Sequence, residues 1–387
     1  MMYKLFGIIV TLFLLCLWWV FMSGDLKFID TQANILQGMD QCFKDKQIPC
    51  RWIPNLVQQY GSPIFNYQAP LPYYVGEAIF LLVKNYHIAI KMIYSISILG
   101  SFIFAYFFIK RLLGEMWGFV ASVFYAVLLF FVISRFSYGG MGFSFGLISL
   151  PIILLSIDVM VLKKGIQSFL IFAIFLAFLL LSSSYHLIFF LIILLWLTFK
   201  YMKLKEKATF LLLSLFSIIL AFSLAAFYFL PAVLERNLIH IIPQVDRIYY
   251  LPKSAKEIPQ EDGDLRYKIL TGDSQVLNFE QGTNWFRFKT ITESHTIIRI
   301  SQFYFPNWKI SVDGKETKVE YLNNSFGLMT IILGKGEHII EGKLNDTPIR
   351  AVSNIISLSS LILLILLFLA QSKKTKVGIS YYKKRIG

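Results

Sequence analysis

Long apolar stretches, separated by short basic ones, make up most of this chain. A run of about 18 or more apolar residues predicts a membrane-spanning helix. Runs of that kind occupy residues 5–22, 88–109, 116–133, 143–162, 208–230 and 351–370. The block 166–199 is longer than one span, and the polar turn Ser182-Ser183-Ser184-Tyr185-His186 interrupts it, which predicts two short spans. The pattern therefore predicts a polytopic α-helical membrane protein with about eight spans.

The composition agrees with this interpretation. Of the residues, 56% are hydrophobic and 17% are aromatic, and the mean hydropathy is +0.63. The first apolar run does not end like a cleaved signal peptide, because Trp18, Trp19 and Phe21 stand where cleavage needs small residues. We expect this run to be retained as a span.

The net charge of +14 comes mainly from short basic clusters between the apolar runs. Such clusters orient helices by the positive-inside rule and attract anionic membrane lipids. A nucleic-acid surface would instead combine basic residues with base-stacking aromatics on a folded face, and no such pattern is visible. We therefore expect membrane lipids as partners and no nucleic acid.

The basic clusters also predict a topology. With Lys4 in the cytoplasm, the clusters at 110–111, 163–164 and 200–207 and the tail 371–387 are all cytoplasmic if the apolar stretch 72–83 does not cross the bilayer. That stretch has the length of an interfacial segment. The sequence thus predicts a multi-pass protein of the plasma (inner) membrane, with both termini cytoplasmic and an interfacial helix at 72–83.

The extracytoplasmic loop 23–74 is polar and rich in proline, and Asp25, Asp30 and Asp40 form an acidic cluster in it. A loop of about fifty residues is too long for a simple connector, which favours a functional role. Cys42 and Cys50 share this exported loop, where a disulfide is permitted, but two free thiols fit the spacing as well.

From about Asp262 the pattern changes to the period of two that is typical of strands. The expected strands are 284–290, 296–301, 308–312, 315–321, 326–333 and 338–344, with Asp313-Gly314 as a tight hairpin turn. They predict a small antiparallel β-sandwich within an extracytoplasmic domain, 235–350, between a transmembrane domain, 1–234, and a last helix, 351–370. Trp308 is expected in its core. Glycan recognition through Trp285, Tyr304 or Trp308 is the alternative.

Several motifs resemble bacterial membrane proteins of the glycosyltransferase C superfamily, of the YfhO-like and pyruvoyl-tetrahydropterin-synthase-related (PTPS-related) types. The likeness rests on Asp30, the run Ile48-Pro49-Cys50-Arg51-Trp52-Ile53-Pro54 and Tyr60-Gly61-Ser62-Pro63. Two later stretches agree, at 226–235 and 303–315.

This resemblance implies transfer of a sugar from a polyprenyl-phosphate donor to a glycan or lipid acceptor of the cell envelope. It implies that Asp30 is the catalytic residue and acts as a base on an acceptor hydroxyl. Asp25 is the second candidate for this role. In metal-dependent members a divalent cation would lie on Asp30. Arg51 and Arg135 would bind the donor phosphate, and His186, Trp52 and Tyr60 would support the site.

The chain departs from the family pattern in two places. The stretch after Arg135 has glycines but no Glu, and no His follows the first-loop Asp closely. A non-catalytic envelope scaffold or accessory subunit is therefore the alternative function. Arg51 has a structural alternative as well, an ion pair with a first-loop acid. Asp40 is expected at the surface, and Asp158 beside Lys163 or Lys164.

Overall fold

The computed structural model describes residues 27–135, 140–183, 186–204, 207–244, 247–259 and 266–386. The chain divides into two compact units. The helical unit contains Ile93–Phe229 and Val352–Gly387 together with Met1–Met22, and the sheet unit contains Ser23–Met92 and Leu230–Ala351. The predicted first span, 5–22, lies outside the described residues.

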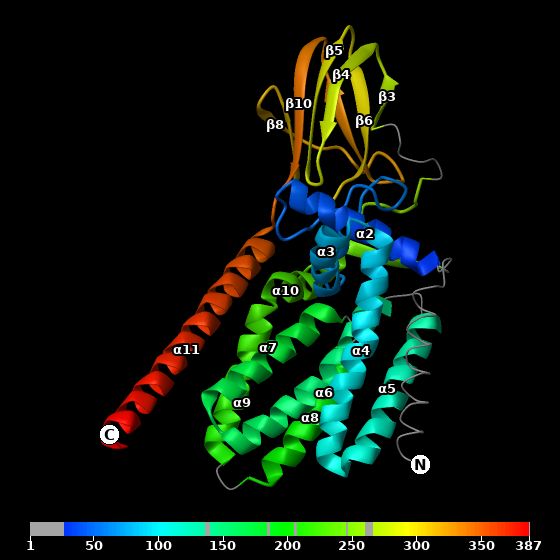
Figure 1. The fold of residues 1–387 in the computed structure, drawn as a ribbon. Helices are drawn as coiled ribbons and strands as arrows, with labels where there is room; N and C mark the ends of the chain where they lie inside the picture. Colours follow the sequence, from blue (N-terminus) through cyan, green and yellow to red (C-terminus); the bar gives the residue numbers. More distant parts are fainter. Residues whose placement is uncertain are drawn as a thin grey trace. The chain divides into compact units, whose positions relative to one another are not determined.

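The helices of the helical unit follow the apolar runs closely. They are α4 (Tyr86–Leu113), α5 (Glu115–Arg135), α6 (Gly140–Lys163), α7 (Ile166–Ser182), α8 (His186–Met202), α9 (Lys207–Leu224), α10 (Ala226–Leu234) and α11 (Pro348–Ile386), of which α4, α10 and α11 continue into the sheet unit. The predicted break in the block 166–199 is confirmed, because α7 ends and α8 begins at the polar turn (Figure 1).

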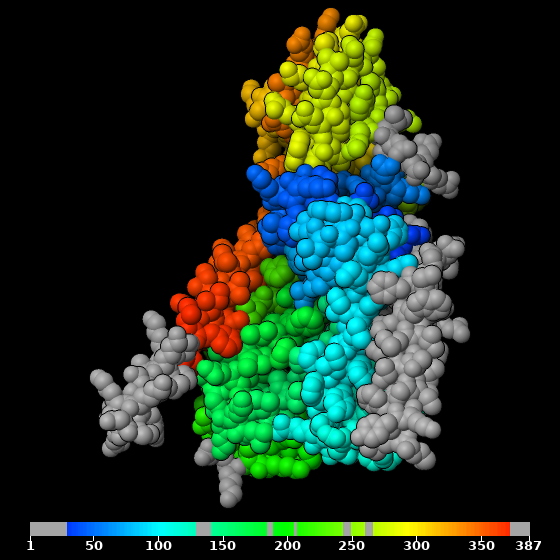
Figure 2. Space-filling view, in the orientation of Figure 1, coloured from blue at the N-terminus to red at the C-terminus, as the bar shows by residue number. Residues whose placement is uncertain are grey.

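The core of this unit centres on α7. Phe169, Phe172, Leu176 and Leu179 are almost fully buried there and pack with apolar side chains of α6 and α9. In the space-filling view, side chains close the gaps between the helix ribbons on the face shown (Figure 2). The apolar sequence of α7 is therefore explained by protein packing on most of its surface.

The predicted single span at 208–230 is wrong in one respect. Helix α9 ends at Leu224, and a second helix, α10, starts at Ala226. A helix start leaves backbone N–H groups without intrahelical partners. One of them, the N–H of Phe227, donates to Ser357 Oγ of α11 at 2.8 Å. A polar side chain thus stabilises a break that hydropathy alone cannot show.

Four helices of the described residues are long and apolar enough to cross a membrane, namely Tyr86–Leu113, Met141–Lys163, Lys207–Leu224 and Pro348–Gln371. The described apolar parts of α5, α7 and α8 are shorter than the 18 residues that such a helix needs. Large apolar side chains such as Leu212, Ile219 and Leu358 are exposed on the candidate spans. Such extensive apolar exposure is typical of a surface that contacts lipid.

The described residues of the sheet unit form ten strands and two complete helices. The strands are β1 (Ile239–Gln244), β2 (Arg247–Pro252), β3 (Tyr267–Thr271), β4 (Ser274–Gln281), β5 (Trp285–Thr292), β6 (Thr296–Phe303), β7 (Trp308–Val312), β8 (Lys315–Thr317), β9 (Leu328–Leu333) and β10 (Gly336–Leu344). They form a hairpin β1-β2, a five-stranded sheet β4-β5-β10-β7-β8 and a three-stranded sheet β3-β6-β9, all antiparallel. The hairpin β1-β2 was not predicted.

The two larger sheets pack face to face, as expected of a sandwich. Tyr267 of β3 stacks near Phe288 of β5, with ring centroids 6.4 Å apart. Burial alternates strictly along β5, where Phe286 and Phe288 point inward. This alternation is what places one face of each strand in an apolar core. Trp308 is 3% exposed, so its predicted core position is confirmed.

The predicted polar loop 23–74 contains a helix, α2 (Lys27–Lys44), which corrects the sequence interpretation. Four of its buried apolar side chains, Ile29, Ala33, Leu36 and Met39, recur every three or four residues. That is the spacing of an amphipathic helix. The polar residues between them concealed the pattern in a stretch that prolines and charges made resemble a loop.

Helix α3 (Leu71–Val83) occupies the stretch that was predicted to be an interfacial helix. Pro72 lies in its first turn, where a missing N–H costs nothing. Lys84, in the left-handed conformation, ends it. The helix is confirmed, and its depth in a membrane stays a prediction.

Residues between α2 and α3, within the predicted loop 23–74, pack against the sandwich. Trp52 is fully buried, with its ring 5.9 Å from that of Phe305 and 6.0 Å from that of Trp308. Gly61 lies directly against the indole with φ +90, so a Cβ at this position would be 2.4 Å from Trp52 Cζ2. The indole therefore requires glycine at position 61.

We expect Gly61→Ala to destabilise the protein by about 2–5 kcal/mol, because left-handed strain adds to a steric clash in a packed core. The matched control is Gly314→Ala, where φ is +77 and nothing lies within 4 Å of the added Cβ. It should cost about 1–2 kcal/mol from strain alone. Thermal unfolding in detergent measures both, and equal losses would contradict the role given to Trp52.

Candidate functional site

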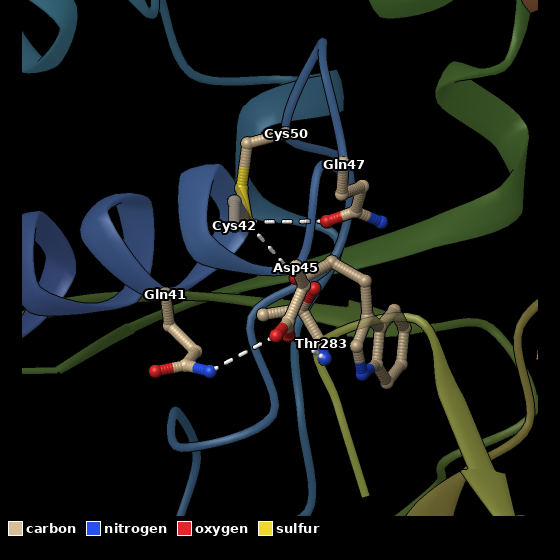
Figure 3. Close-up of a disulfide and its surroundings, with 7 residues drawn as sticks. Gln41, Cys42, Asp45, Gln47, Cys50 and Thr283 are labelled. Carbon is tan, nitrogen blue, oxygen red and sulfur yellow. Dashed lines mark hydrogen bonds between the residues drawn. A yellow bond between two sulfur atoms is a disulfide. The ribbon is translucent and has the colours of Figure 1, made fainter.

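A disulfide between Cys42 and Cys50 fixes the end of α2 to the chain that follows it (Figure 3). The sequence left a disulfide and two free thiols open, and the structure forms the disulfide. Beside it, Asp45 accepts hydrogen bonds from the Thr283 backbone N–H at 2.6 Å and from Gln41 at 3.1 Å. Residues of the first loop are thereby held to the turn between β4 and β5.

Asp30 lies in the first turn of α2 and lines a cavity of about 730 Å³. Its carboxylate is exposed, and its Oδ1 lies 2.9 Å from Nε2 of His87, at the start of α4. In the Nε2–H tautomer the imidazole donates to the carboxylate and orients it. The sequence analysis missed His87, because it looked for a histidine close to Asp30 in sequence rather than across two helices.

The other walls of this cavity are mainly polar. Five amides, two tyrosines and a guanidinium contribute, from Asn34, Gln37, Asn55, Gln58, Gln59, Tyr249, Tyr250 and Arg266. Amides offer both donors and acceptors to hydroxyl groups, and tyrosine rings offer flat apolar faces. This lining fits a ligand with many hydroxyl groups on a ring, such as a sugar.

One wall of the cavity has an unusual backbone. Val57, Gln58 and Gln59 are three successive residues in the left-handed region, with φ of 54, 55 and 68. A β-branched residue such as Val57 rarely adopts this conformation. Strain of this kind concentrates at binding sites, where the surrounding structure holds it. Here it directs two neighbouring amide side chains to the cavity.

Arg51 is 4% exposed and contacts Asn66 Oδ1 at 3.2 Å and Asp346 Oδ1 at 3.7 Å. Burial lowers its pKa to about 10, against the opposing effect of Asp346. The ion pair that the structure shows is with Asp346, far beyond the first loop, and a pair with a first-loop acid stays a prediction. The predicted contact of Arg51 with a donor phosphate finds no support in this buried geometry.

A second buried arginine lies nearby and was not predicted. Arg350 is fully buried, and its Nε and Nη2 lie 2.8 Å from Glu235 Oε2. Thr347 donates to the other oxygen of Glu235, and Tyr67 donates to the Glu235 backbone carbonyl at 3.0 Å. The guanidinium also lies 4.8 Å from the centre of the Phe305 ring. The guanidinium is not fully satisfied, because its buried Nη1 has no hydrogen-bond partner among the described residues.

Trp52 and Tyr60 were predicted to support the site, and both are core residues. Tyr60 is 7% exposed, and its ring lies 5.6 Å from that of Phe303. Its backbone carbonyl accepts the N–H of Phe303 at 2.9 Å. In the structure, Trp52 and Tyr60 therefore hold the predicted loop 23–74 against the sandwich.

Asp40 was expected at the surface, but it is 5% exposed. It accepts from Tyr86 Oη and pairs with Lys44 Nζ, both at 2.6 Å. Glu77 of α3 is 4% exposed and lies near Asp40. Burial and the neighbouring Asp40 carboxylate raise the pKa of Glu77 to about 7. Of the two candidate acids that the structure describes, Asp40 is therefore buried and Asp30 is exposed.

Asp158 of α6 does not pair with Lys163 or Lys164 as expected. Its carboxylate, which is 2% exposed, lies 2.8 Å from Lys200 Nζ and 3.3 Å from Arg111 Nε. The indole N–H of Trp196 donates to it at 3.2 Å. The ion pairs thus join α6 to the ends of α4 and α8 within the helical unit.

The remaining predicted site residues lie outside what the structure describes. Asp25 is one, and so are the side chains of Arg135, at the end of α5, and His186, at the start of α8. Their predicted roles stay predictions. Among the described residues no group of three or more His, Cys, Asp or Glu side chains is placed to hold a metal ion. Asp30 and His87 supply two donors, so we derive no step through a metal.

The apolar helices with lipid-type surfaces indicate a membrane protein, and a comparison of families agrees. Residues 65–246 match the model of the 6-pyruvoyl-tetrahydropterin synthase related domain, which is described as a membrane protein. The chain is thus similar to the PTPS-related membrane proteins over this segment, which includes His87 and Glu235 but begins after Asp30. Neither a curated protein nor a solved structure matches the chain.

We expect Glu235→Gln to lower the free energy of unfolding by about 3–5 kcal/mol, because it leaves the Arg350 cation buried without its anion. Adding Arg350→Met to the same chain should recover part of this loss. The control is Glu341→Gln, which breaks a pair with Arg287 that is about half exposed on both sides and should cost about 1 kcal/mol or less. Arg350→Met alone completes the cycle, and chemical unfolding in detergent gives the four values. A loss in the double variant equal to the sum of the two single losses would argue against the pair.

The raised pKa of Glu77 predicts a pH dependence of stability. Its ordinary pKa is 4.5 and its folded pKa is about 7, so the folded state favours the protonated acid. The corresponding stabilisation is present below pH 4.5 and is lost as pH rises to about 7, on the order of 3 kcal/mol at most. Glu77→Gln should remove this decline, whereas Glu337→Gln, at an exposed position, should keep it. An unchanged decline in Glu77→Gln would assign it to other groups.

Proposed function

We propose that this protein is a membrane glycosyltransferase that moves a sugar from a polyprenyl-phosphate donor to a glycan or lipid acceptor of the cell envelope. The observation that carries the proposal is the Asp30–His87 pair beside a cavity lined by amides and tyrosines. A carboxylate that is exposed to the cavity and oriented by an imidazole has the geometry of a general base.

The chemistry follows from this placement. The acceptor hydroxyl oxygen attacks the anomeric carbon of the donor while its proton passes to the Asp30 carboxylate. The bond between the anomeric carbon and the phosphate oxygen breaks, and the polyprenyl phosphate leaves with the electron pair. His87 acts as a positioning residue for Asp30, and the amides of Asn34 and Gln59 hold sugar hydroxyl groups.

The arrangement in the membrane is part of the proposal. We infer about eight spans, counting the candidate spans, the shorter apolar helices and the run 5–22, with both termini cytoplasmic in the plasma (inner) membrane. The sheet unit then lies outside the cytoplasm, where its disulfide is stable. In that arrangement α3 lies at the interface, at the depth of a lipid-linked phosphate.

A non-catalytic envelope scaffold is the second candidate. The observation in its favour is that Arg51, predicted to bind the donor phosphate, is buried and occupied by Asn66 and Asp346. A scaffold needs no donor site at all. It would co-purify with a stable partner and transfer no sugar from any donor.

The test is sugar transfer by membranes that contain the full chain, with radiolabelled polyprenyl-phosphate sugars as donors. Asp30→Asn should lower the rate by about 10²- to 10⁴-fold, the usual contribution of a general base. His87→Gln should lower it less and should shift the pH–rate profile, because the imidazole no longer orients the carboxylate. Asp273→Asn, at an exposed acid elsewhere in the unit, should leave the rate unchanged. Wild-type transfer by Asp30→Asn would remove Asp30 from the mechanism.

A further inference from the structure

The three-stranded sheet β3-β6-β9 carries two cations side by side on its outer face. Lys268 of β3 and Arg299 of β6 are directly opposite in the antiparallel register. Ile298 and Ile300, the neighbours of Arg299 on β6, point into the sandwich and are buried, so Arg299 points the other way. Like charges directly opposite each other destabilise a sheet. Fold stability alone therefore gives no reason for this pair.

Arg299 is also partly withdrawn from water without compensation. Its Nε is buried and has no hydrogen-bond partner among the described residues. Burial lowers the pKa of the guanidinium from its ordinary value, and no carboxylate of the described residues acts against the shift. Arginine usually satisfies such a group with a carboxylate or a phosphate in a bidentate contact. An anion from outside the chain would supply what the described residues do not.

Both cations line one cavity of about 740 Å³, separate from the cavity that holds Asp30. A volume of this size suits a small-molecule ligand. The apolar side of the cavity is formed by Ile258, Pro259 and Phe326. Glu257 is also at the wall, where the Ser325 hydroxyl donates to it at 3.2 Å. The cavity thus offers two positive charges next to a ring and aliphatic surface.

We propose that Lys268 and Arg299 bind the anionic group of a small ligand, a phosphate or a carboxylate on a sugar-sized body. The anion lies between the two side chains and removes their mutual repulsion. The body of the ligand lies against Phe326 and Pro259. This site is independent of the proposed sugar transfer, because it uses none of the residues around Asp30.

Three hexoses that differ in one group test the proposal, namely glucose 6-phosphate, glucuronate and glucose. Each is titrated by calorimetry into the purified full chain in a neutral detergent. At least one of the two anionic sugars should bind, and the stronger one identifies the anion. Binding should weaken as salt is raised from 50 to 200 mM, by screening over about a Debye length. Glucose should bind at least tenfold more weakly, and equal binding of glucose would overturn the proposal.

The variants locate the site. Arg299→Gln and Lys268→Gln should each weaken binding of the anionic sugar by tenfold or more, the usual effect of losing a charged hydrogen bond. Lys268 is exposed, so its variant keeps the fold and serves if Arg299→Gln does not fold. Lys289→Gln, which removes an exposed cation from β5, is the matched control and should bind as wild type does. Equal affinity of Lys289→Gln and Lys268→Gln would place the anion elsewhere and overturn the proposal.

Discussion

The buried ion pair between Glu235 and Arg350 is the contact on which the sheet unit depends. These residues are 115 positions apart, at the two ends of the segment that forms all ten strands. Their pairing therefore closes the strand region where the chain enters it from α10 and leaves it into α11. A buried pair is costly to desolvate, so its surroundings decide what it contributes to stability. Thr347 and Tyr67 donate to Glu235, and the ring of Phe305 lies beside the guanidinium, whose Nη1 has no hydrogen-bond partner among the described residues.

The first loop contributes to the same structure. Arg51 contacts Asp346 four residues before Arg350, and Trp52 packs against Phe305, the ring over which the Arg350 guanidinium lies. Arg51 thus contacts the charged part of the core, and its neighbour Trp52 contacts the aromatic part. Arg51 and Trp52 belong to the motif that suggested a catalytic loop in the sequence. In the structure these two residues attach the loop to the sandwich. Buried Arg and Trp residues can look alike in a sequence whether they bind a ligand or another part of the chain.

Hydrophobic pattern alone predicted the helices well, because an apolar run has few alternatives in a membrane protein. It located the break between α7 and α8 and every strand from β5 to β10, and it placed Trp308 in the core. The pattern failed where the structure depends on contacts between residues that are far apart in the sequence. The break before α10 depends on Ser357, and the pairing of Asp158 depends on Arg111 and Lys200 from other helices. Helix α2 is the exception, since its spacing of Ile29, Ala33, Leu36 and Met39 was readable and was obscured by polar neighbours.

The two acids of α2 show why the site could be predicted only in part. Asp30 and Asp40 are alike in sequence, but they differ in orientation because ten residues on a helix with 3.6 residues per turn place them about 80° apart. Asp40 turns toward Tyr86 and Glu77 and is buried, whereas Asp30 faces the cavity and meets His87. Both are therefore held by α4, one by Tyr86 and the other by the next residue. Two successive residues at the start of α4 thus contact one buried and one exposed carboxylate, and this difference in exposure is the reason why we propose Asp30 as the base.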